Sequence, residues 1–139
     1  MIPKNPSKLA LLIQHASYEK WHLAATLAAT TTAMGGEVHI FLSHEALISF
    51  VQEEMDLAPP QFANKKINEC YQTFLEEEKI SKPTNLFKRA KELGPLKFYG
   101  CSESVKLFRL QAEYTKKLDG VIGYMTFLDI ASDGRFIVI

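Results

Sequence analysis

Residues 9–42 constrain the fold of this chain more than any other segment. They open with a continuous apolar run, Leu9-Ala-Leu-Leu-Ile13, which is typical of a strand covered on both faces. The alanine-rich stretch 19–34 predicts a helix that can lie close to a sheet, and Gly35-Gly36 predicts its end. A second apolar run, 38–42, follows. The segment therefore predicts a right-handed βαβ unit with parallel strands.

Three further apolar runs predict the rest of the sheet. They lie at 95–99, 121–124 and 136–139. Helices are expected between the strands, at 43–51, 83–93, from 102 to about 117, and at 126–131. Five strands that alternate with helices predict a three-layer α/β/α fold built on a five-stranded, mainly parallel sheet.

The region 52–83 departs from this alternation. It is polar and charged, and Pro59-Pro60 interrupts it. Residues 68–80 predict a helix, because Tyr71, Phe74 and Leu75 fall on one side of it. The region is too long for a simple connection. We therefore predict one domain over residues 1–139 with a helical insertion at about 52–83.

Composition and charge exclude several classes of protein. With 139 residues, 47% hydrophobic and 23% charged, the chain is expected to be globular. Sixteen basic and sixteen acidic residues cancel, so no general attraction to nucleic acid or to an anionic membrane is expected. No signal-peptide pattern or run long enough to span a bilayer is seen. A cytoplasmic protein is the expectation.

The sequence contains no recognisable motif for a metal or a cofactor. Cys70 and Cys101 are far apart, which excludes a disulfide framework or a cysteine-rich zinc site. No metal-ligand spacing, dinucleotide loop or phosphate loop occurs. We expect neither a metal nor a cofactor.

Three polar turns follow the first three predicted strands of the sheet. They are Gln14-His15-Ala16-Ser17, Ser43-His44 and Gly100-Cys101-Ser102. Sites in open parallel sheets form at the carboxyl ends of strands, so neighbouring strands would bring these turns to one edge. The catalytic candidates are Cys101, His15 and His44, although a helix-start or solvent-facing role is also open for both histidines. The binding candidates are Gln14, Ser17, Ser43, Gly100, Ser102, Glu103 and Ser104.

Cys101 is the one candidate nucleophile that the sequence offers at this edge. It lies between a predicted strand and a predicted helix, where the backbone N–H groups of residues 102–104 and the helix dipole would stabilise a thiolate. Glu103 would oppose this with its negative charge. A free cysteine is also often a small buried apolar residue. The pattern leaves a reactive thiol and a packing role open.

With these residues in view, the chain resembles the DsrE/DsrF-like family of sulfur-relay proteins. The first βαβ unit, with Gly35-Gly36-Glu37-Val38, is similar to the start of that family. Phe98-Tyr-Gly-Cys101-Ser-Glu-Ser104 is similar to its cysteine segment, which is the most specific of the matches. The stretch Leu118-Asp-Gly-Val-Ile-Gly123, through Phe127-Leu128, looks like its next strand and helix.

The resemblance implies a fold, an assembly and a chemistry. Family members have a five-stranded parallel sheet, assemble as trimers or hexamers, and in several cases carry sulfur as a cysteine persulfide for a small sulfur-carrier protein. The matching cysteine is Cys101, so a cytoplasmic persulfide carrier, or a persulfide sulfurtransferase if it is an enzyme, is the expectation. The first alternative is a non-catalytic oligomeric domain that binds a ligand or partner, with Cys101 structural. The second is a redox sensor that pairs Cys101 with Cys70.

Overall fold

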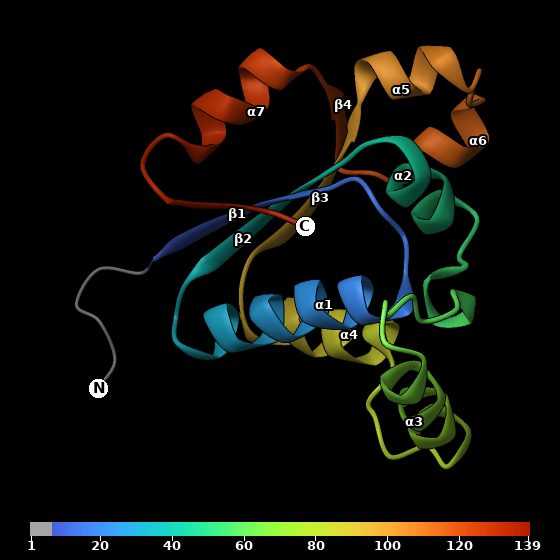
Figure 1. Cartoon of the computed structure of the whole chain (residues 1–139). Coiled ribbons are helices and arrows are strands. Elements are labelled where there is room, and N and C mark those ends of the chain that lie inside the picture. Colours follow the sequence, from blue (N-terminus) through green and yellow to red (C-terminus); the bar gives the residue numbers. More distant parts are fainter. Residues whose placement is uncertain (1–6) are drawn as a thin grey trace.

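A five-stranded, all-parallel sheet forms the centre of the molecule (Figure 1). The computed structural model describes residues 7–139; residues 1–6, where a leader segment would begin, lie outside this range. The strand order is β4-β3-β2-β1-β5. The strands are β1 (Lys8–Ile13), β2 (Glu37–Leu42), β3 (Leu96–Cys101), β4 (Gly120–Ile122) and β5 (Arg135–Val138). The predicted fold class is confirmed.

Helices lie on both faces of this sheet and at its carboxyl edge (Figure 1). Helices α1 (Tyr18–Ala33) and α4 (Pro83–Leu93) pack against each other below one face, and α7 (Tyr124–Ala131) covers the other. The remaining helices are α2 (His44–Val51), α3 (Lys65–Glu76), α5 (Ser102–Leu107) and α6 (Ala112–Thr115), with a 3-10 turn η1 at Met55–Leu57. Across residues 7–139, no helix combines the length and the apolar character needed to cross a bilayer.

Strand alternation divides the core into two unequal parts. Successive side chains of a strand point to opposite faces, so Leu9, Leu11 and Ile13 of β1 join the larger cluster that α1 and α4 cover. The intervening Ala10 joins a smaller cluster on the α7 face. The members of the smaller cluster are Ala10, Phe41, Cys101, Phe127 and Ala131. Cys101 therefore faces α7 rather than the main core.

The end of α1 shows why two glycines follow it. Gly35 has a φ of 85°, a left-handed conformation that glycine adopts without strain. At Gly36 a side chain would place its Cβ 2.5 Å from the backbone oxygen of Ser7. The chain can therefore turn directly from α1 into β2.

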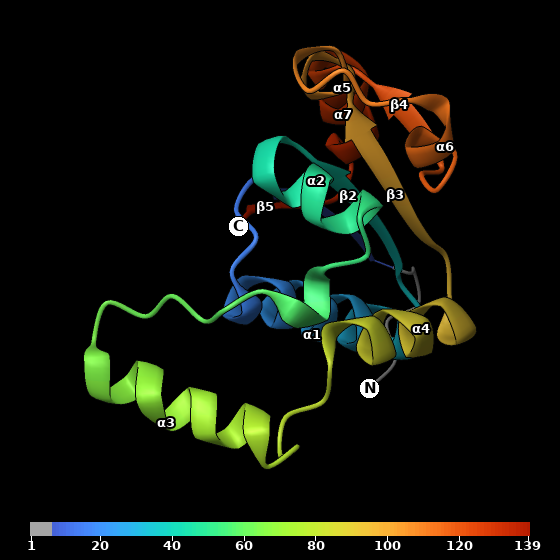
Figure 2. The ribbon, with the colours of Figure 1, turned by 90° about the vertical axis from the view of Figure 1, so that its right-hand side faces the viewer.

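The segment between α2 and α4 contains η1 and α3. Helix α3 projects from the body of the domain (Figure 2), and none of its residues is buried. It begins and ends earlier than predicted. It starts at Lys65 because the Asn64 side chain accepts a hydrogen bond from the Ile67 N–H at 3.1 Å. It ends before Glu78, whose φ is 56°.

The prediction of a single helix from 102 to about 117 is wrong. Two short helices, α5 and α6, take its place. Arg109, between them, has a φ of 51°, and an α-helix does not continue through such a residue. The Leu110 N–H instead bonds to the Val105 carbonyl at 3.0 Å, which closes the last turn of α5.

Candidate functional site

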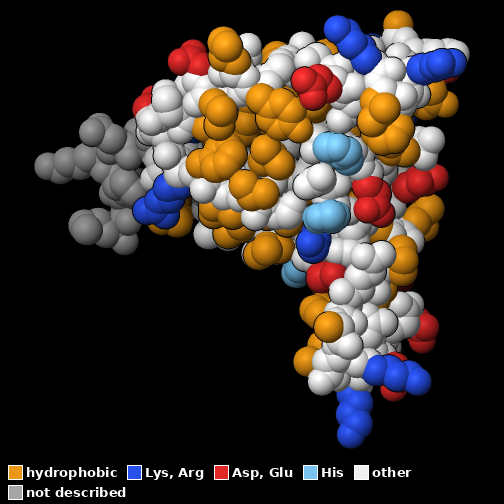
Figure 3. Space-filling view, turned by 45° about the horizontal axis from the view of Figure 1, so that its top comes forward, with side chains coloured by type: hydrophobic (Ala, Val, Ile, Leu, Met, Phe, Trp, Pro, Cys, Tyr) orange, Lys and Arg blue, Asp and Glu red, His pale blue; other side chains and the backbone are white. Residues whose placement is uncertain are grey.

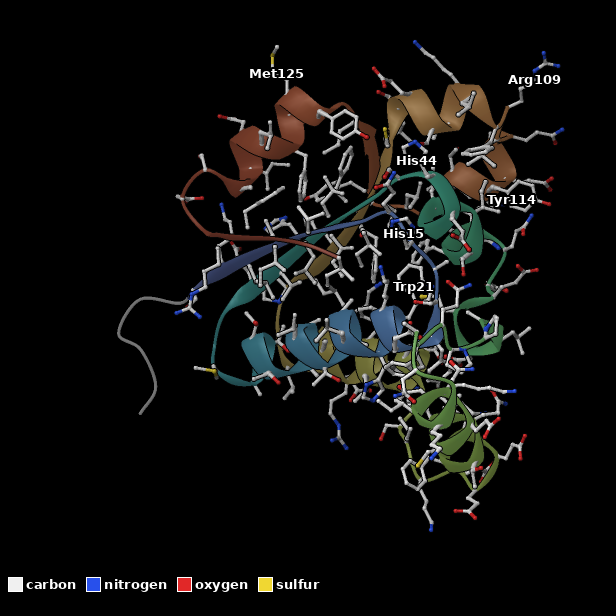
Figure 4. All side chains as sticks on the ribbon, viewed as in Figure 1. His15, Trp21, His44, Arg109, Tyr114 and Met125 are labelled. Atoms are coloured by element: carbon white, nitrogen blue, oxygen red, sulfur yellow. The ribbon has the colours of Figure 1, made fainter. Side chains whose placement is uncertain are left out.

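The carboxyl edge of the sheet brings together the turns after β1, β2 and β3. These strands are neighbours in the order β3-β2-β1. The prediction that their three turns meet at one edge depended on this arrangement. The Gln14 carbonyl accepts a hydrogen bond from Ala46 at 3.1 Å, joining the first turn to the start of α2. Figure 4 shows His15 and His44 at this edge of the sheet.

Cys101 is the last residue of β3 and immediately precedes α5. Its side chain is only 1% exposed and packs in the cluster with Phe41 and Phe127. The thiol makes no capping hydrogen bond to the first turn of α5, so the backbone donors expected at residues 102–104 do not hold it. Both cysteines are free; Cys70 is exposed on the projecting α3.

A small cavity lies beside Cys101. Its volume is about 240 Å³, room for several water molecules at about 30 Å³ each. The lining residues are His44, Cys101, Glu103, Ser104, Leu107 and Tyr124. Three larger hollows, of about 660, 580 and 350 Å³, are lined by none of the candidate site residues. Of these four hollows, only the smallest is therefore lined by residues that the sequence singled out as site candidates.

Tyr124 covers this cavity from the first turn of α7. Its ring packs edge-on against Phe41, with the ring centres 5.1 Å apart, and the residue is 38% exposed. Tyr124 and Cys101 line the cavity together. Burial, followed by the neighbouring Cys101, raises the pKa of Tyr124. The phenol is thus protonated at neutral pH.

His44 connects α2 to the same cavity. Its backbone has a φ of 49°, a left-handed conformation in which histidine is enriched. The His44 N–H donates to the Ser104 hydroxyl at 3.1 Å, and its Nδ1 lies 3.1 Å from the Ser43 hydroxyl. The Gln14 amide nitrogen lies 3.5 Å from the same Nδ1. These contacts hold the start of α2 beside the start of α5.

The other predicted site residues have different positions. His15 is exposed and does not line the cavity. Ser17 precedes α1, and its buried hydroxyl has no hydrogen-bond partner within residues 7–139. Gly100 is buried where a side chain would meet Leu118, with its Cβ 2.6 Å from a methyl carbon. Ser102 is half-buried at the start of α5.

One side of the cavity carries a negatively charged side chain. Glu103 is exposed and lines the opening, and its charge also contributes to the raised pKa of Tyr124. The carboxylate predicted to oppose a thiolate at Cys101 therefore does face the site. In the part of the chain described, no group of three or more His, Cys, Asp and Glu side chains is placed to hold a metal ion.

Tyr124 and Leu107 are the lining residues that the sequence did not single out. The sequence assigns Tyr124 to the end of a strand, whereas it is the first residue of α7. One signal could have identified it: Gly123-Tyr124 follows β4, which lies next to β3. The rule that sites form where parallel strands end applies to this fourth turn as well.

Comparison with known proteins adds no relative. No family model matches the chain, and no match is found among the curated proteins. The fold and the cavity at Cys101 are therefore the observations on which a function can be argued.

Proposed function

We propose that this protein is a sulfur-relay protein that carries sulfur as a persulfide on Cys101 and passes it to a partner thiol. The observation that carries the proposal is the position of the Cys101 thiol beside a small cavity that His44 and Tyr124 also line. The resemblance of the segment 98–104 to the DsrE/DsrF-like cysteine segment supplies the particular chemistry.

Persulfide exchange needs no outside oxidant or reductant. The Cys101 thiolate attacks the outer sulfur of a donor persulfide; a new S–S bond forms as the donor's S–S bond breaks, and the donor leaves as a thiolate that takes up a proton. An acceptor thiolate then attacks the outer sulfur of the Cys101 persulfide. That second exchange restores the Cys101 thiolate, so the reaction makes the protein a carrier or, with turnover, a persulfide sulfurtransferase.

The cavity is consistent with this cargo. A persulfide adds one sulfur atom to the thiol, and about 240 Å³ leaves room for that atom and for the approach of a slender donor group. Glu103 at the opening disfavours anionic donors. We accordingly propose a small sulfur-carrier protein with an extended cysteine-bearing segment as the partner, and a cytoplasmic setting in which the thiols stay reduced.

The proposal is tested by persulfide loading. After incubation with a small persulfide donor, the Cys70→Ser protein is expected to gain the mass of one sulfur atom. Mass spectrometry of the digested protein would place that atom on the peptide containing Cys101. The protein with both Cys70→Ser and Cys101→Ser, which has no thiol, is the matched control and is expected to gain none. Absence of the adduct from Cys70→Ser protein in donor excess would contradict the proposal.

The burial of Cys101 favours a second candidate function. At 1% exposure, Cys101 can also be a packing residue in a non-catalytic domain that binds a ligand or partner at this edge. Alkylation separates the two candidates, because a packed thiol in the folded protein stays unmodified at neutral pH. A redox pair with Cys70 is less well supported: α3, which carries Cys70, projects from the end of the molecule opposite α5 (Figures 1 and 2).

We also propose that the chain assembles with itself, as a trimer or hexamer. Figure 3 shows hydrophobic side chains gathered over the face that carries α7 and β5. Met125 and Leu128 of α7 are 86% and 55% exposed. The β5 side chains Phe136, Ile137 and Val138 are exposed as well. An apolar patch of this kind commonly marks a protein interface.

Two charged substitutions test the assembly. The protein with Met125→Lys and Leu128→Lys is expected to run as a monomer in sedimentation, whereas the wild type runs as a trimer or hexamer. A charge at the centre of an apolar interface would be buried without a partner. The matched control is Leu23→Lys, on exposed α1 surface away from this face. A monomeric wild type at all accessible concentrations would overturn the assembly.

A further inference from the structure

Helix α3 turns an apolar stripe to the solvent. The helix projects from the domain (Figure 2), and none of its 12 residues is buried. Ile67 and Phe74 are 52% and 41% exposed, and Cys70, between them in the chain, is exposed as well. These positions are three and four residues apart, so they share one side of the helix. We call this exposed side of α3, made of Ile67, Cys70 and Phe74, the α3 stripe.

A neighbouring side of α3 is in contact with the domain. Tyr71 and Leu75 are half-buried there. The ring centre of Tyr71 lies 5.0 Å from that of Phe62 and 6.1 Å from that of Tyr18. These aromatic contacts fix the rotation of α3 on the domain, so the α3 stripe stays turned to the solvent.

The charges at the two ends of α3 oppose the dipole of the helix. Lys65 and Lys66 are its first two residues; Glu76 is its last, and Glu77 and Glu78 follow. A helix favours acidic residues at its N-terminus and basic residues at its C-terminus. Helix α3 has no acidic residue in its first turn and no basic residue in its last. A charge pattern that lowers the stability of the helix by itself indicates a function outside it.

Most of these charges have no partner among the described residues. At the acidic end, Lys79 forms an ion pair with Glu77 at 3.0 Å, and both side chains stay largely exposed. Glu76, Glu78 and the two lysines at the other end form no ion pair with another described residue. The ends of α3 therefore keep opposite charges that a partner can meet.

A second copy of α3, lying antiparallel, has the complementary pattern. The basic start of each helix would lie beside the acidic end of the other and beside the negative end of its dipole. Cys70 is at the middle of α3, so the twofold axis of such a pair would pass near it. Ile67 of each copy would then meet Phe74 of the other. A parallel pair would bring ends of like charge together.

We propose that α3 is a self-recognition surface, through which two copies of this chain pair antiparallel across the α3 stripe. A helix of 12 residues is about 18 Å long, too short to bury the roughly 800 Å² per partner of a stable interface. One pair is therefore weak, and the protein with Met125→Lys and Leu128→Lys stays monomeric in dilute sedimentation. Several such pairs acting together can join larger assemblies. The pairing does not depend on the sulfur-relay function.

Thiol cross-linking tests the pairing. In Cys101→Ser protein, Cys70 is the one thiol that remains. A short bismaleimide joins two thiols only where they come close together. A covalent dimer is therefore expected on a denaturing gel, and its amount is followed against the concentration of the full-length protein. Cross-linking at a high concentration captures pairs that are too weak to persist in sedimentation.

Charge reversal tests the antiparallel arrangement. Lys65→Glu with Lys66→Glu is expected to raise the concentration for half-maximal cross-linking about tenfold, because like charges then meet at both ends of the pair. Loss of the helix does not explain such a result, since acidic residues at its N-terminus stabilise α3. Adding Glu76→Lys and Glu77→Lys to this variant is expected to restore cross-linking. Unchanged cross-linking in the first variant, or none regained in the second, would overturn the arrangement.

The matched control moves the thiol to the other side of the helix. In protein with Cys70→Ser and Cys101→Ser, Glu69→Cys places a thiol at an exposed position away from the α3 stripe and measures chance collisions. A Cys70 protein that cross-links no more readily than this control would overturn the self-pairing and leave α3 for a different partner. The Cys70 dimer is also expected in protein carrying Met125→Lys and Leu128→Lys, so failure of the α7 and β5 interface does not remove it.

Discussion

Trp21→Ala is expected to lower the free energy of unfolding by about 3–5 kcal/mol, among the largest losses for a single truncation in this chain. Trp21 is fully buried where α1 packs on the sheet. Its ring meets Phe87 of α4 edge-on, with ring centres 6.4 Å apart. Removing it leaves a cavity between the two helices that they cannot close without moving off the sheet. Urea unfolding followed by circular dichroism measures the loss.

Two further variants separate packing from other effects of this substitution. The indole N–H of Trp21 is buried without a hydrogen-bond partner in the described part of the chain. Trp21→Phe removes that unpaired donor while keeping an aromatic ring, so a smaller loss than for Trp21→Ala is expected. Leu23→Ala, on the exposed side of the same helix, is expected to change little. Equal losses at positions 21 and 23 would contradict the packing assigned to α1.

Phe127→Ala is the second substitution with a large expected effect. Phe127 is 1% exposed and joins α7 to the sheet through its stack on Phe41. Truncation of a buried phenylalanine costs about 3–5 kcal/mol. The loss is expected to fall mainly on α7, because the cluster beneath that helix is small. Hydrogen exchange is therefore expected to quicken in residues 124–131 more than in α1, besides the fall in unfolding free energy.

The same substitution links stability to the site. Loosening α7 also disturbs the cavity that Tyr124, at the first turn of this helix, lines together with Cys101. Persulfide loading of Cys101 is therefore expected to fall in Phe127→Ala. Leu128→Ala is the control, since Leu128 is the next residue on α7 and points outward. A stable Phe127→Ala protein with unchanged exchange in α7 would show that this helix is held by other contacts.

The sheet was predictable because its signals are local. Leu9-Ala-Leu-Leu-Ile13 is apolar at every position, as a strand covered on both faces requires. The Gly35-Gly36 pair marks a tight turn between α1 and β2 that the structure confirms. The strand order also satisfied the condition that the first three strands be neighbours. These features depend on periodicity and turn chemistry within a short stretch of chain.

The parts of the site that escaped prediction depend on contacts between distant segments. Whether His15 or His44 reaches the cavity depends on the path of each turn, which their sequences do not encode; the structure places only His44 there. The helical conformation is interrupted at Arg109, although no glycine or proline occurs next to this residue to signal the interruption. Tyr124 lines the same cavity as Cys101 only because β4, which precedes α7, lies next to β3.

The most direct measurement of the central claim is a load-and-release experiment on Cys101. The Cys70→Ser protein is loaded from a donor persulfide whose outer sulfur is isotopically labelled, freed of donor, and mixed with an acceptor thiol. The account predicts one labelled sulfur on the Cys101 peptide after loading, and its complete transfer to the acceptor afterwards. Label that never appears on Cys101, or that stays there in excess acceptor thiol, would contradict the carrier function.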